Sequence, residues 1–136
     1  MNKITKFTDL NCWKEAHKLV LMIYQITEKF PSKEQFGLTN QIRRAGVSIT
    51  SNIAEGFSRS TLKDKIHFYY ISQGSVSEVQ SQLIIAKDIK YIVEIDYTKI
   101  YKQSIIVHKL ISGSIKSLKK SPLIVLYYPY YILRTT

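Results

Sequence analysis

Histidine and cysteine are the side chains of this sequence best suited to metal binding or nucleophilic chemistry. His17, His67 and His108 fall in three different predicted helices, and none has a second His or Cys three or four residues away, as a local metal site needs. The single Cys12, beside Trp13, is expected to be a small buried residue. The sequence has no glycine-rich phosphate loop, nucleophile elbow or paired-carboxylate motif. We therefore expect no metal, no cofactor and no enzymatic activity.

The charge of the chain is the clearer functional signal. Lys and Arg number 20 against 10 Asp and Glu, which gives a formal net charge of +10. An excess of this size favours a polyanionic partner, with solubility alone as the alternative interpretation.

The basic residues gather at three places in the sequence. Lys14 and Lys18 are four residues apart on one predicted helix, where like charges repel, so folding gains nothing from the pair. Such cations can contact phosphates in a salt-sensitive way, and without a base-reading motif we expect recognition of shape more than of sequence. The candidate nucleic-acid-binding residues are Lys14, Lys18, Arg43, Arg44, Arg59, Lys63 and Lys65.

A polar stretch runs through an otherwise apolar segment between residues 41 and 59. Asn52 and Glu55 lie next to apolar Ile49 and Ile53, so we expect partly buried polar groups that need partners. The predicted structural polar network contains Ser48, Asn52, Glu55, Gly56, Gly74 and Glu78, with Arg59 and Ser75 as further candidate partners. The alternative is that the same residues form part of a contact surface.

Four helices are predicted to position these residues. Apolar residues recur at helical spacing in residues 10–30, 38–57, 62–86 and 97–118. Residues 32–121 contain no proline, and connections between the blocks are short, which favours long helices with antiparallel neighbours. The predicted fold is all-α, an antiparallel up-and-down four-helix bundle.

Local signals predict how these helices begin and pack. Gly74, in the middle of the third block, is expected to allow a neighbouring helix to approach closely. Side-chain caps are expected from Asp9 or Asn11 for the first helix, Ser60 or Thr61 for the third, and Asp96 for the fourth.

The predicted bundle domain covers residues 1–120, and residues 121–136 form an apolar, aromatic-rich tail. The tail is expected to lie over the bundle or to be poorly ordered, with an adhesive segment that joins protomers as the alternative. The N-terminus lacks the apolar core of a signal peptide, and no window is long enough to span a membrane. We therefore expect a cytoplasmic protein.

The order and spacing of four motifs resemble a known bacterial family. They are Leu10-x-x-Trp13-x-x-Ala16, Phe30-Pro31-x-x-Glu34-x-Phe36-Gly37-Leu38, Gln41-Ile42-Arg43-Arg44-Ala45 running into Ser51-Asn52-Ile53-Ala54-Glu55-Gly56, and Gln73-Gly74-Ser75-x-x-Glu78. The family is that of four-helix bundle proteins encoded within 23S ribosomal RNA intervening sequences, and the chain is also similar to the accessory variability proteins of diversity-generating retroelements.

The resemblance implies a ring-shaped homo-oligomer, typically a pentamer, with a basic surface suited to RNA or DNA and no catalysis. In the retroelement relatives the ring is a partner of a reverse transcriptase. By matched position, Arg43, Arg44 and Arg59 carry the basic residues of the family. Its helix-packing signature corresponds to Asn52, Glu55, Gly56, Gly74 and Glu78. The tail beyond Lys120 departs from the family pattern.

The leading hypothesis is a non-enzymatic, homo-oligomeric protein that binds structured nucleic acid, with ribosomal RNA preferred over DNA. The alternative is a protein-interaction scaffold, with a reverse transcriptase as one possible partner. A third hypothesis is an enzyme that uses Glu55 or Glu78 with a histidine, which requires these groups to converge in a pocket.

Overall fold

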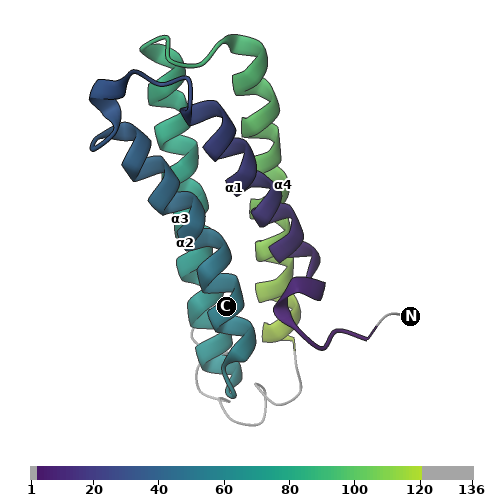
Figure 1. Ribbon diagram of the computed structural model, residues 1–136. Helices are drawn as coiled ribbons and strands as arrows, with labels where there is room; N and C mark the ends of the chain where they lie inside the picture. Colours follow the sequence, from purple (N-terminus) through teal and green to yellow (C-terminus); the bar gives the residue numbers. More distant parts are fainter. Residues whose placement is uncertain (1–2, 121–136) are drawn as a thin grey trace, which may run out of the picture.

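The computed structural model describes residues 3–120, and four α-helices make up most of that range. The helices are α1 (Asn11–Thr27), α2 (Leu38–Ser58), α3 (Leu62–Asp88) and α4 (Glu94–Lys119), with short 3-10 helices η1 (Phe7–Asp9) and η2 (Ser32–Glu34). No β-strand occurs in residues 3–120, and the helices run alternately up and down (Figure 1). The predicted antiparallel four-helix bundle is confirmed. The predicted tail, 121–136, lies outside the described residues.

The helices pack in a closed ring of neighbours. α1 contacts α2, α2 contacts α3, α3 contacts α4, and α4 returns to α1. The α2–α3 interface and the α1–α4 interface therefore lie on opposite sides of the bundle (Figure 1). Within the described range, no helix combines the length and the apolar character needed to cross a membrane.

The core consists of aliphatic side chains that recur along each helix at three- or four-residue intervals. Ile49 and Ile53, whose β-branched side chains lean locally towards strand, are fully buried in α2, because their spacing places both on its inner face. Burial of one such side chain contributes about 1.5–3 kcal/mol. The largest fully buried side chains are Leu19, Ile23, Ile42, Ile49, Ile53, Leu83, Ile100, Ile111, Val76, Val79 and Val107.

The predicted caps agree with the structure at one helix of three. Thr61 caps α3, since its Oγ1 accepts a hydrogen bond from the Asp64 N–H at 3.2 Å. The prediction for the first helix is wrong: its N-cap is Leu10, and the Asp9 carboxylate instead accepts hydrogen bonds from the backbone of the segment before η1. The prediction for Asp96 is also wrong, because α4 begins at Glu94 and Asp96 lies inside the first turn.

Two glycines other than Gly74 mark the close approaches between helices. A Cβ on Gly46 would lie 2.8 Å from Ile23 Cδ1 of α1, and a Cβ on Gly56 would lie 3.0 Å from Tyr69 Cε1 of α3. A Cβ on Gly74 would meet no atom within 4 Å. The expectation that Gly74 admits a neighbouring helix is therefore wrong for the described helices of this protomer, because residue 74 faces outward.

Candidate nucleic-acid interface

Lys14 and Lys18 project from the exposed side of α1. The nearby acid, Glu15, forms no ion pair with either lysine in residues 3–120, and its Oε2 accepts a hydrogen bond from Gln103 Nε2 of α4 at 2.7 Å. Arg44 is exposed on α2, and Lys63 is exposed at the start of α3. These four candidates are accessible, but they lie on three different helices.

Arg43 is half-buried and is held in place by two residues of α1. Its Nε donates a hydrogen bond to Thr27 Oγ1 at 2.8 Å, and its guanidinium carbon lies 4.6 Å from the centre of the Tyr24 ring. A guanidinium placed over an aromatic face is stabilised by the ring quadrupole. Arg43 therefore joins α1 to α2, and its donor groups are only partly available to a phosphate.

The turn between α2 and α3 uses two further cations for its own structure. Arg59 Nη2 lies 2.6 Å from Glu55 Oε1, and the Arg59 guanidinium carbon lies 4.7 Å from the centre of the Phe68 ring. Lys65 Nζ donates a hydrogen bond to the Phe57 carbonyl at 2.6 Å, and so pairs an otherwise free carbonyl at the negative end of α2. Burial lowers the pKa of Lys65.

The polar network is narrower than the sequence indicates. Asn52 Nδ2 donates to the Ser48 carbonyl at 2.8 Å and lies 3.0 Å from Ser48 Oγ, and the Ser48 hydroxyl lies 2.9 Å from that of Ser75 on α3. Glu55 lies outside this chain of bonds, since it is exposed and pairs with Arg59. The network therefore links α2 and α3 through small hydroxyl and amide groups.

The remaining members of the predicted network do not join it. Gly56 is buried against the Tyr69 ring, and Gly74 is exposed. Glu78 is exposed on α3 and lines a polar pocket with Arg44, yet within residues 3–120 the two form no ion pair.

The three histidines lie apart on α1, α3 and α4. His17 stacks on Trp13 with ring centroids 4.8 Å apart, and His67 packs edge-on against Phe68. In the part of the chain that the structure describes, no group of three or more His, Cys, Asp or Glu is placed to hold a metal ion.

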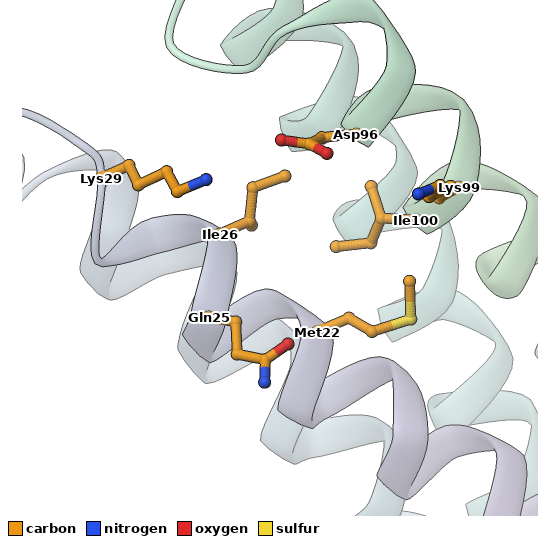
Figure 2. Close-up of a pocket in the computed structure, with 7 residues that line it drawn as sticks. All are labelled: Met22, Gln25, Ile26, Lys29, Asp96, Lys99 and Ile100. Carbon is orange, nitrogen blue, oxygen red and sulfur yellow. The ribbon is translucent and has the colours of Figure 1, made fainter.

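A groove between α1 and α4 brings together basic residues that the sequence analysis missed. The groove has a volume of about 240 Å³ and is lined by Met22, Gln25, Ile26, Lys29, Asp96, Lys99 and Ile100. Figure 2 shows the Lys29 side chain extending from the turn after α1 towards Ile26 and Asp96. Lys29 lies just beyond α1, which ends at Thr27, in the turn that follows the helix. Its four-residue interval from Gln25, which also lines the groove, is the signal that could have predicted Lys29.

Most positive charge in the described range has no acidic partner. Only Arg59 and Lys87 form ion pairs in residues 3–120, with Glu55 and with Asp88. We use the name α1 lysine row for Lys14 and Lys18 on α1 together with Lys29 in the turn just after it. All three are exposed and unpaired in that range. Phosphates of a polyanion would supply the missing countercharge.

Comparison with known proteins identifies a family and a similar solved structure. The family model described as 23S rRNA-intervening sequence protein matches residues 8–113. Among solved structures, the chain is similar to a protein of unknown function from the S23 ribosomal protein family of Bacteroides thetaiotaomicron VPI-5482. The two chains are 24% identical, the match covers 77% of this chain and 98% of that chain, and the TM-score is 0.72, which supports the fold. A comparison with curated proteins found no match.

Proposed function

This chain belongs to the family of 23S rRNA-intervening sequence proteins, and we propose that it is a non-enzymatic protein that binds structured nucleic acid, with ribosomal RNA preferred over DNA. The proposal rests on one observation, the surplus of exposed positive charge. The net charge is +10, and two ion pairs neutralise cations in residues 3–120. The family description favours ribosomal RNA as the source of phosphate. Such a ligand implies a cytoplasmic protein.

The α1 lysine row is the proposed centre of the interface. Each ammonium group that meets a phosphate releases condensed counterions, so binding weakens steeply with added salt. Lysine contacts to phosphates position the ligand and carry no base information. The protein would therefore select the fold of an RNA in preference to its sequence. Exposed Arg44 and Lys63 would extend the contact to a second side of the bundle.

We further propose that the protein assembles as a homo-oligomer. The expected form is a ring-shaped pentamer, as the family resemblance implies. Support comes from α3, which carries apolar side chains on its outer side as well as in the core. Ile71, Ile84 and Ile85 are 39%, 39% and 48% exposed. A helix that is apolar on both sides is expected to bury both.

A protein-interaction scaffold is the second candidate function. Phe36 is 88% exposed before α2, and Val93 and Ile95 are 62% and 65% exposed at the start of α4. Figure 1 shows the α1–α2 and α3–α4 connections at the same end of the bundle. Exposed aromatic and aliphatic groups of this kind suit a protein partner, such as a reverse transcriptase. A reverse-transcriptase gene beside this one would favour the scaffold, and a position inside an rRNA operon would favour RNA binding.

The test is binding of the purified protein to a structured rRNA fragment and to duplex DNA of equal length, over a salt series. We expect tighter binding to the RNA and a steep loss of affinity with salt. In the Lys14→Ala/Lys18→Ala variant, the slope of log affinity against log salt should fall by about 1.5, because two phosphate contacts are removed. Light scattering on the same sample should give about five times the 15.8 kDa chain mass.

The matched control is Lys33→Ala/Lys90→Ala, which removes the same charge from two exposed positions outside α1. An equal loss of affinity in both variants would show that binding depends on the net charge of the protein and not on a defined surface. It would overturn the assignment to the α1 lysine row. Absence of binding to either nucleic acid at 50 mM salt would overturn the proposed function.

A further inference from the structure

We propose that the groove between α1 and α4 binds one unpaired guanine of the RNA ligand; this inference rests on the proposed function and adds a specific base to it. The groove has the three parts that a nucleotide needs: an apolar floor, a hydrogen-bonding carboxylate and cations at its edge. These parts come from two helices that are neighbours only in the folded protein.

The floor of the groove is apolar. Met22, Ile26 and Ile100 line it, and Figure 2 shows these side chains lying between the two helices. A flat base can pack on such a surface, and a polarisable thioether adapts to the face of an aromatic ring. The volume of about 240 Å³ is below the range of about 300–1,000 Å³ that holds drug-sized ligands. It suits a single base.

The Asp96 carboxylate supplies the base preference. Within residues 3–120 it forms no ion pair and accepts no side-chain hydrogen bond, although it lines the groove. Asp96 lies in the first turn of α4, which places its carboxylate on the α4 side of the groove. The groove therefore presents an unsatisfied pair of acceptors to an incoming ligand.

Guanine is the base whose Watson–Crick edge matches a carboxylate. Its N1–H and exocyclic amino group are adjacent donors, which can meet both carboxylate oxygens at once. On that edge, adenine and cytosine each place one amino donor beside a ring-nitrogen acceptor, and uracil places one N–H between two carbonyls. Because base pairing uses the same edge, the guanine must be unpaired and turned outward, as in the loops and bulges that proteins read in RNA.

The cations at the edge fit the phosphates on either side of that base. Lys29 from the turn after α1 and Lys99 from α4 both line the groove, and neither has an acidic partner in the described range. Lys18 and Lys14 continue the row along α1. A strand that places its base between the helices would thus meet ammonium groups before and after it.

The experiment compares hairpin RNAs that differ at one unpaired loop position, which is guanine, inosine or adenine. Inosine lacks the 2-amino group, so it should bind about fivefold more weakly than guanine, and adenine about tenfold more weakly, given the usual worth of a bidentate base contact. The Asp96→Asn variant should bind the guanine hairpin about tenfold more weakly and should no longer distinguish guanine from inosine.

Charge alone predicts the opposite result for this variant. Removing a negative charge from a phosphate-binding surface should tighten binding to every hairpin. Lys29→Ala is the matched control, since it should weaken binding to all three hairpins alike. Far-UV circular dichroism checks the folding of each variant, and the inosine comparison in the wild-type protein needs no variant.

Unchanged or tighter binding of the guanine hairpin by Asp96→Asn, or equal binding of guanine and inosine by the wild type, would overturn the guanine site. The salt-sensitive affinity common to all hairpins would then remain, and with it the proposed function. If no hairpin binds at low salt, both proposals fail.

Discussion

The α2–α3 interface and the α1–α4 groove lie on opposite sides of one bundle. Polar side chains are hydrogen-bonded within the protein at the interface, whereas in the groove Lys29 and Asp96 are left without protein partners among residues 3–120. At the α2–α3 interface, the Ser72 hydroxyl donates to the Ile49 carbonyl at 2.8 Å, and Ser48 bonds to Ser75. In the groove, Lys29 and Asp96 line an open space without bonding to each other. Polar groups already satisfied inside the protein fix the distance between two helices. Those left unsatisfied at the surface are available to a ligand.

Substitution of a core side chain should give the largest difference in unfolding free energy between the two regions. Ser72 is fully buried, so Ser72→Leu should lower the free energy of unfolding by about 3 kcal/mol, because it overpacks the interface and removes a hydrogen-bond donor. Met22→Leu in the groove keeps the volume and should cost less than about 1 kcal/mol. Urea unfolding followed by circular dichroism measures both. Similar losses in the two variants would contradict the contrast between a tight and an open side.

Alkaline pH should weaken the tight side through Tyr69, which packs against Gly56 of α2. Burial raises the pKa of Tyr69 from 10.0 to about 12. The unfolded chain therefore loses this proton at lower pH than the folded protein, and stability falls as pH rises from about 10 towards 12. Between pH 9 and 11.5, the wild type should lose about 2 kcal/mol more than Tyr69→Phe. Parallel urea titrations test this, and identical pH profiles would show that Tyr69 does not contribute.

Substitution of single basic residues should give the smallest difference in stability. Arg43→Ala should cost about 1 kcal/mol, because the hydrogen bond to Thr27 and the contact with the Tyr24 ring are lost. Lys18→Ala should change stability by less than about 0.5 kcal/mol, since Lys18 is exposed and unpaired in the described range. Thermal unfolding at equal protein concentration compares the two. A larger loss for Lys18 would give it a structural role and weaken its assignment to binding.

The fold was predictable because it depends on short-range periodicity. The three- and four-residue spacing of apolar side chains defines all four helices, and it outweighs the strand preference of Ile49 and Ile53. Helix starts were less predictable. Whether Asp96 caps α4 depends on where the preceding turn ends, and the helix begins two residues before it, at Glu94.

The candidate site was predictable only where exposure follows from a single helix. Predicting the exposure of Lys14 and Lys18 required no tertiary information. Predicting the position of Arg43 did, since its partner Thr27 lies 16 residues away on another helix. The groove required the most, because its residues come from the first helix, the turn after it and the last helix, and no sequence spacing relates Lys29 to Asp96 or Lys99.

The connectivity of the bundle also bears on the order in which it folds. The α2–α3 hairpin closes through residues 59–61, whereas the Glu15–Gln103 contact between α1 and α4 joins residues 88 positions apart. Closing a longer loop costs more chain entropy, so the hairpin is expected to form early and α1 to dock late and detach first. A ligand bound between α1 and α4 would stabilise the contact that forms last. Ligand binding should therefore increase the protection of the α1 amides from hydrogen exchange.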